Sequence, residues 1–278
     1  MTIDSHQHFW KFDPVRDAWI DTSMNTIQRD FMPLDLKPEL EKTGFDGCIA
    51  VQADQSAMET QFLLNLANEF PWIQKVVGWV DLNSPEIESK LESHMSEPKL
   101  AGFRMILQVL EPEAMEDPKF LYGISLLQKY GFTYDILIYP KHLKAAFELA
   151  KKYPDQPFVL DHLAKPNIKG GEYEFWKQGI SGISELPNVW CKVSGMVTEA
   201  DWKHWKPEDF KLYLDHISDS FGSKRLMFGS DWPVCLLAGN YSTVFDLAYH
   251  YYKSFSQEEQ KGIFGNNACE FYGIKRNE

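Results

Sequence analysis

The first stretch of the chain with chemical potential is residues 3–8, Ile-Asp-Ser-His-Gln-His, close to the start. If this stretch is extended, alternate residues share a face, so that Asp4, His6 and His8 point the same way. Two imidazoles and a carboxylate on one face suit neither an ordinary surface strand nor an apolar core. The pattern indicates either an exposed polar edge or a strand whose inner face ends in a chemical site, with Asp4 one layer deeper as a supporting partner.

Further polar residues interrupt later apolar runs, mainly toward the carboxyl end of each run. They are Gln52, Asp54, Asp81, Arg104, Asp135, Asp161, His162, Lys165, Lys192, Ser194, Ser230 and Asp231. Imidazole and carboxylate groups suit zinc or another single divalent ion, and four residues could supply them: His6, His8, His162 and Asp231. The same groups can act without a metal, because Asp231 can accept a proton from water while histidines and Arg104 stabilise an oxyanion. Spacing alone does not choose between the two.

Eight short β-branched and aromatic runs must position these residues. They cover residues 2–8, 47–54, 75–82, 100–107, 132–139, 157–164, 189–195 and 225–232. Most are almost continuously apolar, which is typical of strands buried on both faces of a parallel sheet. Helical periodicity in the intervening segments, at 58–67, 141–152 and 212–221, completes a strand–helix alternation. We therefore predict an α/β fold, a (β/α)8 TIM barrel, whose strand ends bring the polar residues to one mouth.

An open doubly wound sheet is the competing architecture, but the GxGxxG loop that it favours after the first strand is absent. No linker or repeat divides the chain, so we expect one barrel domain over residues 1–278. Residues 9–35 form a long insert, rich in Trp and Asp, after the first strand. A loop of this length at a barrel mouth predicts a lid or a pocket wall.

The composition limits the partners of the protein. A net charge of −12 argues against nucleic acid and against anionic membranes. No basic leader segment and no apolar run of about 18 residues is present. The four cysteines are scattered without a C-x-x-C pair, which predicts buried free thiols in a reducing compartment. We expect a cytoplasmic protein with a small-molecule substrate, and a homodimer is one assembly that the sequence allows.

Four motifs in order connect the chain with a known family: D-S-H-Q-H-F-W at 4–10, G-F-R at 102–104, D-H-L-A-K-P at 161–166 and G-S-D-W-P at 229–233. Together they resemble the amidohydrolase superfamily, and more narrowly its branch of L-fuconolactonase, L-rhamnonolactonase and 2-pyrone-4,6-dicarboxylate lactonase types. The resemblance spans residue 3 to about residue 271. It implies a metallo-dependent hydrolase-like barrel in which His6 and His8 belong to the first strand and His162 to the sixth. Asp231, at the eighth, would activate water.

The chain departs from the two-metal members of that superfamily. Arg104 stands where they place a bridging lysine or glutamate, and Asp135 or a neighbour stands where the fifth strand usually offers a histidine. A two-metal centre is therefore not expected. Members of the branch work with one metal or none, so the resemblance implies either no required cofactor or one divalent ion such as zinc.

Six further residues are candidates for substrate binding: Gln52, Trp79, Asp135, Lys165, Lys192 and Trp232. The two lysines could instead reach the rim without a catalytic role. Arg104 needs a partner because an unpaired buried guanidinium is costly, so it either pairs with a core carboxylate such as Asp135 or faces the substrate. Four tryptophans could form an aromatic wall, of which the neighbour of Asp231 is favoured: Trp10, Trp19, Trp79 and Trp232.

The resemblance implies a hydrolase that opens the ester bond of a sugar-acid lactone, such as an L-fucono- or L-rhamnonolactone, by attack of water activated by Asp231. The acidity of the chain favours an uncharged, hydroxyl-rich lactone over a dicarboxylate. Two alternatives remain open. One is a metal-dependent non-oxidative decarboxylase of an aromatic acid, and the other is a non-catalytic sugar-binding barrel.

Overall fold

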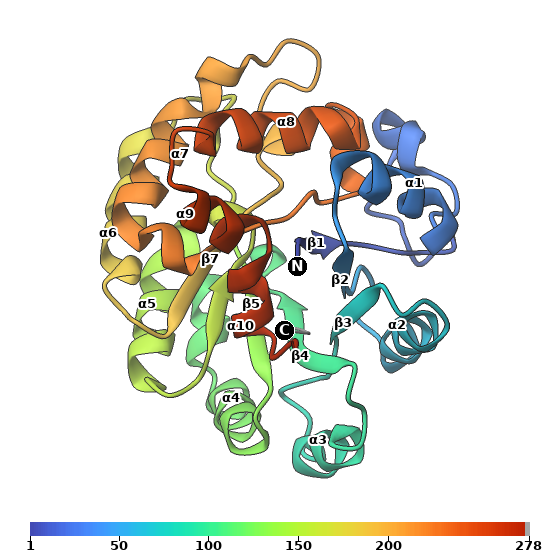
Figure 1. Ribbon diagram of the computed structural model, residues 1–278. Helices are drawn as coiled ribbons and strands as arrows, with labels where there is room; N and C mark the ends of the chain where they lie inside the picture. The colour runs from blue at the N-terminus through green and yellow to red at the C-terminus, as the bar shows by residue number, and fades with distance from the viewer. Residues whose placement is uncertain (276–278) are drawn as a thin grey trace.

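The computed structural model describes residues 1–275 and contains an eight-stranded sheet in the order β1 to β8, with every neighbouring pair parallel (Figure 1). The strands are β1 (Ile3–Gln7), β2 (Gly47–Val51), β3 (Ile73–Gly78), β4 (Leu100–Ile106), β5 (Thr133–Leu137), β6 (Phe158–Leu160), β7 (Val189–Val193) and β8 (Leu226–Phe228). A parallel bridge between Gln7 and Trp232 joins the first strand to the segment after the last. The predicted (β/α)8 barrel is confirmed.

Helices surround the strands and connect them (Figure 1). They are α1 (Pro33–Thr43), α2 (Ala57–Glu69), α3 (Ile87–His94), α4 (Pro118–Tyr130), α5 (Leu143–Lys152), α6 (Tyr173–Ser184), α7 (Pro207–Phe221), α8 (Tyr241–Tyr252), α9 (Gln257–Lys261) and α10 (Asn267–Phe271). Local chemistry sets their ends. Ser56 Oγ caps α2 by accepting from Glu59 N at 3.1 Å. Gly131 ends α4 at a φ of 74°, a conformation that favours glycine.

The barrel has apolar packing on both sides of its wall. The larger cluster fills the space between the strands and the surrounding helices. A second cluster lies at the amino-terminal end of the barrel and joins strand residues such as Ile3, Val77 and Met227 to Phe271 and Tyr272. The C-terminal segment with α10 therefore covers this end. All four cysteines are buried, and Cys48, Cys191 and Cys235 are free thiols, as predicted.

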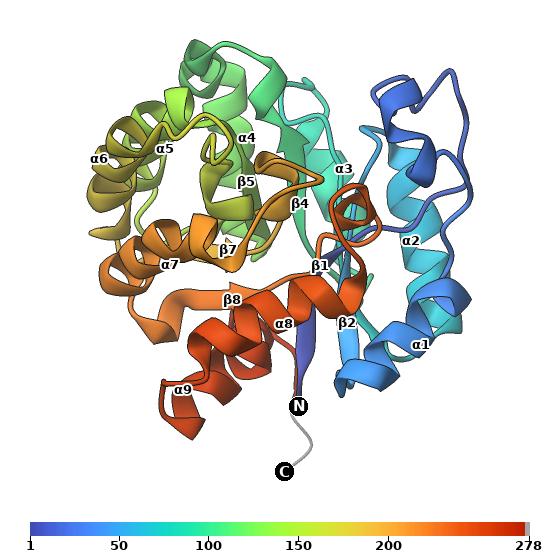
Figure 2. The ribbon, with the colours of Figure 1, turned by 90° about the horizontal axis from the view of Figure 1, so that it is seen from above.

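The insert after β1 is a loop whose ends are tied together. Trp10 and Phe31 exchange two backbone hydrogen bonds of 3.0 and 2.9 Å, and Trp10 Nε1 also donates to Arg29 O at 2.8 Å. Between them lies the 3₁₀ helix η1 (Thr22–Ile27). In Figure 2 the dark-blue insert lies at the end of the molecule away from the N-terminus. Within residues 1–275, none of the helices combines the length and the apolar character needed to span a membrane.

The predicted strands extend beyond the observed ones at their carboxyl ends. The predicted runs 157–164 and 225–232 contain strands of only three residues each, β6 and β8. The residues that follow them, including His162 and Asp231, leave the sheet with φ angles of 54° and 57°. The strand-like sequence pattern therefore continues past the last residues that pair in the sheet. The backbone of these following residues forms the mouth of the barrel.

Candidate active site

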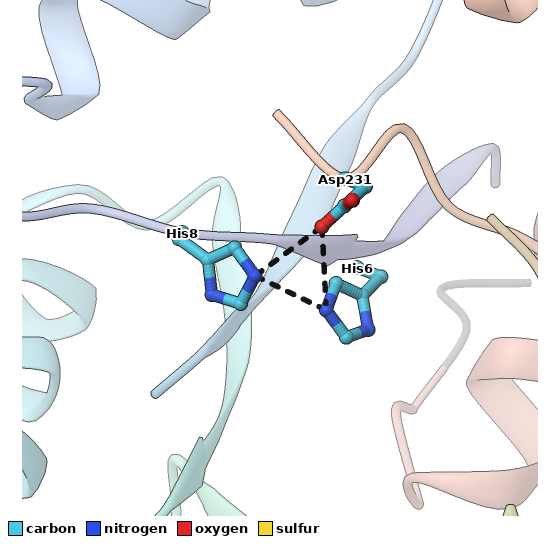
Figure 3. A group of neighbouring side chains, drawn as sticks. All are labelled: His6, His8 and Asp231. Carbon is cyan, nitrogen blue, oxygen red and sulfur yellow. Dashed lines mark hydrogen bonds and ion pairs between the residues drawn. The ribbon is translucent and has the colours of Figure 1, made fainter. Parts of the chain in front are cut away.

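Four predicted residues meet at the mouth of the barrel around one carboxylate oxygen. Asp231 Oδ1 lies 3.4 Å from His8 Nε2, 3.9 Å from His6 Nε2 and 3.9 Å from His162 Nε2. The two β1 histidines are also in contact, with 3.2 Å between their Nε2 atoms (Figure 3). All four residues are buried. The sequence motifs from β1, β6 and β8 thus converge on one cluster.

Asp4 holds the strand-to-loop junction that carries Asp231. Its Oδ1 accepts from Ser230 N at 2.9 Å and from His6 N at 3.1 Å, while its Oδ2 accepts from Tyr241 Oη in α8 at 3.0 Å. The Asp4 carboxylate thus points toward an outer helix, whereas the ring of His6 points into the barrel. The prediction that these side chains share one face was wrong, because the register of β1 shifts between Asp4 and Gln7. The supporting role predicted for Asp4 is consistent with its contacts to Ser230, His6 and Tyr241.

His162 sits in a left-handed turn built from non-glycine residues. His162, Leu163, Ala164 and Lys165 have φ angles of 54°, 55°, 57° and 51°. Each left-handed residue costs roughly 1–2 kcal/mol, so that tertiary contacts must compensate. Trp176 Nε1, fully buried in α6, donates to Leu163 O at 2.7 Å, and Lys165 N donates to His162 O at 2.7 Å. The turn aims both His162 and Lys165 at the mouth.

Gly195, directly after β7 and Ser194, must remain a glycine for His162 to keep its place. A Cβ at Gly195, whose φ is 59°, would lie 2.4 Å from His162 Nδ1. We therefore expect Gly195→Ala to push the imidazole off Ser194 Oγ, its 2.9 Å partner, and to lower kcat by about 10²-fold or more. Gly131→Ala is the matched control, since Gly131 also has a positive φ but no neighbour within 4 Å of the added methyl. Steady-state kinetics and melting temperatures of both variants test this. Equal activity losses would show that left-handed strain, and not the contact with His162, is responsible.

The cluster presents several electron pairs to one point. His8 Nδ1 lies 2.8 Å from Val51 O, and since a carbonyl can only accept, Nδ1 carries a proton, so that in the neutral ring Nε2 carries a lone pair. That lone pair faces Asp231 Oδ1 and the Nε2 atom of His6. Such a convergence is unfavourable unless a proton or a cation lies between the atoms. Two imidazoles and a carboxylate within 4.8 Å of one another are a donor set that fits a divalent ion such as zinc.

The neutral ring of His6 has two possible tautomers, and its neighbours favour the one with the proton on Nδ1, because Arg104 Nη1, which can only donate, lies 3.3 Å from Nε2. His6 Nδ1 lies 3.1 Å from the donor Lys192 Nζ and 3.3 Å from the acceptor Asp161 Oδ1. If Lys192 donates to Nδ1, Nε2 carries the proton, and its N–H then opposes the N–H of Arg104 Nη1, which disfavours this form. If instead Nδ1 donates to Asp161, Nε2 offers a lone pair to a cation. Burial lowers the pKa of His6 well below its usual value and that of His162 to about 4, so both rings are neutral at pH 7.

Below the histidines the barrel holds a buried ionic cluster. Arg104 Nη1 donates to Asp161 Oδ2 at 2.8 Å. Lys192 Nζ donates to Asp135 Oδ2 and lies 3.0 Å from Asp161 Oδ1. Tyr272, from the C-terminal segment, donates to Asp135 Oδ2 at 2.8 Å. The partner of Arg104 is therefore Asp161 and not Asp135: although Arg104 and Asp135 are register partners on β4 and β5, Asp135 pairs with Lys192 and Tyr272.

A cavity of about 270 Å³ opens beside Asp231. Its lining residues are His8, Trp10, Trp19, Ala53, Gln55, Arg104, Ile106, Gln108, Val109, Leu137, His162, Lys165, Asp231 and Val234. Trp10 and Trp19 come from the insert, and their rings meet edge to face with centroids 6.1 Å apart. Lys165 also lines the cavity, and its Nζ forms an ion pair with Glu199 Oε1 at 2.6 Å.

Five residues predicted to bind substrate are not part of this lining in the described chain. Gln52 Nε2 donates to Arg104 O at 3.1 Å, and Asp135 and Lys192 lie in the ionic cluster. Trp232 is buried against Phe9 and Phe31, and Trp79 is bound to Thr60 through its backbone. Gln55 and Gln108 line the cavity as well, although neither was among the residues predicted from the sequence. Alternate spacing from Arg104 through Ile106 to Gln108 was the signal that could have found the latter.

An eight-stranded barrel with an H-x-H pair on β1 and an aspartate after β8 has the architecture of the amidohydrolase class. The family model described as Amidohydrolase matches residues 3–274. The chain therefore belongs to the amidohydrolase family, as its motifs predicted. It is 36% identical over 284 residues to an L-fucono-1,5-lactonase of Burkholderia ambifaria, a match that covers 99% of this chain and 96% of that protein.

Two further proteins are similar to this chain. A crystal structure of an amidohydrolase from Burkholderia multivorans with bound zinc matches with a TM-score of 0.96 and 35% identity, covering 99% of this chain and 100% of that one. An L-rhamnono-gamma-lactonase of Scheffersomyces stipitis is 26% identical over 62% of this chain and 59% of its own length. The likeness therefore includes proteins named as sugar lactonases and a zinc-bound structure.

Proposed function

We propose that this protein hydrolyses the ester bond of a sugar-acid lactone. The observation that carries the proposal is a buried carboxylate, Asp231, which contacts three imidazoles at the end of a cavity large enough for a small ring. The names of the lactonase relatives supply the substrate class. The insert is proposed to form part of the cavity wall through Trp10 and Trp19.

In the proposed reaction Asp231 acts as the general base. Burial alone would raise its pKa, but the imidazoles of His162, His8 and His6 lower it overall below its ordinary value, so the carboxylate is ionised at neutral pH. All three of its contacts with the histidines are made by Oδ1, so we assign Oδ2 to the attacking water. The carboxylate accepts a proton from water as the water oxygen attacks the ester carbonyl carbon. The protonated Asp231 then gives this proton to the ring oxygen as the C–O bond breaks.

The histidines have different parts in this scheme. His8 cannot donate from Nε2 while its proton is on Nδ1, bonded to Val51 O. His162 can donate from Nε2 when its Nδ1 accepts from Ser194 Oγ, so we assign it, with the guanidinium of Arg104, to the oxyanion. If zinc binds, His6, His8, His162 and Asp231 are the candidates to hold it, and the ion would polarise the carbonyl or acidify water.

The charges around the cavity favour a neutral substrate. Both cations of the lining already have carboxylate partners: Arg104 pairs with Asp161 at 2.8 Å and Lys165 with Glu199 at 2.6 Å. A substrate carboxylate would find each cation already neutralised and would face the charge of Asp231. This supports an uncharged lactone over a dicarboxylate, and over the aromatic acid that a decarboxylase would need.

A hydrolysis screen tests the proposal. Purified protein, with and without a chelator, is mixed with a panel of 1,4- and 1,5-aldonolactones in a weakly buffered pH-indicator assay. We expect at least one 6-carbon lactone to be opened with kcat/KM of about 10⁴ M⁻¹s⁻¹ or more. Loss of CO₂ from an aromatic acid in the presence of added metal, with no lactone opened, would instead establish the decarboxylase.

A further inference from the structure

Two glutamine side chains line one wall of the cavity. Gln108 lies in the 3₁₀ helix η2 (Leu107–Val109), directly after β4. Arg104, Ile106 and Gln108 all line the cavity, so that alternate residues continue one face past the end of the strand. Gln55 follows β2 and is attached to the same wall, since its Oε1 accepts from Ile106 N at 2.9 Å. The two carboxamides thus belong to one surface.

The carboxamide of Gln108 is incompletely paired. Its Oε1 is buried and has no hydrogen-bond partner among residues 1–275. A buried polar atom without a partner is destabilising, and turning the amide by 180° would only replace an unpaired oxygen with an unpaired nitrogen. The unpaired carboxamide of Gln108 does not stabilise the fold, but Gln108 lines the cavity. A ligand in the cavity that can donate and accept hydrogen bonds would supply the missing partner.

Gln55 offers the complementary chemistry. Because its oxygen is occupied by Ile106 N, its N–H groups remain, and none of them has a partner in the described chain. Around the two amides the wall is apolar: Trp10, Trp19, Ala53, Ile106, Val109, Leu137 and Val234. A buried acceptor on Gln108 and a donor on the solvent-exposed Gln55 thus lie on one wall of the cavity, whose other polar groups include those of the candidate reaction centre.

We propose that Gln108 and Gln55 form a hydroxyl-binding subsite that orients the ring of a neutral polyhydroxy lactone toward Asp231. A hydroxyl group can donate to Gln108 Oε1 and accept from Gln55 Nε2, whereas an ionised carboxylate can only accept. The subsite would therefore favour a lactone that carries this hydroxyl over an otherwise identical lactone that lacks it. This inference rests on the proposed function and adds the residues that determine its specificity.

The test combines a substitution in the protein with the removal of one hydroxyl group from the substrate. Wild type and Gln108→Leu are assayed on the best lactone of the screen and on its monodeoxy analogues. For one hydroxyl position, wild type should lose about 10–100-fold in kcat/KM when the hydroxyl is removed. In Gln108→Leu the intact lactone should already show this loss, and removal of the same hydroxyl should cost less than about 3-fold more.

Three controls make the result specific. Leu110→Ala changes an exposed residue directly after the same 3₁₀ helix, outside the cavity lining, and should keep the full deoxy penalty. Gln55→Glu retains an acceptor for Ile106 N but lacks the amide donor, and should weaken kcat/KM about 5-fold or more for the hydroxylated lactone. Gln108→Leu should melt at the wild-type temperature or about 1–3 °C higher, because an unpaired buried oxygen is removed.

Two outcomes overturn the proposal, and they differ. If every deoxy penalty is the same in wild type and in Gln108→Leu while lactones are hydrolysed, the subsite is refuted and the lactonase function stands. If wild type opens none of the lactones with or without metal, the lactonase function fails, and the subsite falls with it.

Discussion

Asp231→Asn is expected to lower kcat about 10²–10⁴-fold on any lactone that the wild type opens. The carboxylate contacts all three histidines of the cluster, and asparagine keeps its volume while losing its basicity. The change should alter kcat far more than KM, because a general base acts on the transition state. Stopped-flow or steady-state hydrolysis assays with chelator-treated protein measure this effect without any contribution from a metal.

Two measurements separate loss of the base from loss of structure. Asp155→Asn changes an exposed carboxylate far from the mouth and should leave kcat unchanged within about 2-fold. The melting temperature of Asp231→Asn should stay close to that of wild type. Activity of Asp231→Asn within about 3-fold of wild type would exclude this residue as the base and transfer the role to a histidine.

Lys192→Met is expected to lower the free energy of unfolding by about 3–5 kcal/mol. Lys192 is fully buried and is shared by Asp135 and Asp161, with contacts of 2.5 and 3.0 Å. Methionine fills a similar volume but leaves both carboxylates with one cation, Arg104, which pairs with Asp161. The variant should also weaken activity, since Lys192 lies 3.1 Å from His6 Nδ1. Guanidinium denaturation followed by fluorescence measures the change in stability.

A second substitution tests the reason for this loss. In Lys192→Met/Asp135→Asn the unpaired charge is removed, while the asparagine oxygen can still accept from Tyr272, so the double variant should regain about 1 kcal/mol or more. Lys141→Met breaks an exposed pair with Glu111 and should change stability by less than about 0.5 kcal/mol. A double variant less stable than Lys192→Met would contradict the charge argument.

The positions of the strands were predictable because buried parallel strands are almost continuously apolar, and that pattern is local. Seven of the eight runs contain a whole strand in the structure, and the run at 75–82 overlaps β3, which begins at Ile73. Their carboxyl ends were not predictable to the residue. At β6 the chain turns left-handed from His162 to Lys165, and the contacts that stabilise the turn come from Trp176 in α6 and Glu199 after β7. Such contacts leave no local trace in the sequence.

The core of the candidate site was predicted, but its surroundings were not. The motifs indicated His6, His8, His162 and Asp231, and the fold brings all four together. The sequence suggested that Arg104 either pairs with a core carboxylate, such as Asp135, or faces the substrate. In the closed barrel, Asp161 is within reach of Arg104, and Lys192 approaches both aspartates from β7.

The sequence by itself determined the family, the barrel and the residue types at its mouth, because strand periodicity and ordered motifs are written along the chain. Only the tertiary structure decided how these residues are used. It turned Asp4 outward through a register shift in β1, paired each cation of the cavity with a carboxylate, and left Gln108 Oε1 without a partner. These features depend on distances between side chains far apart in the sequence, and such distances are set when the barrel closes.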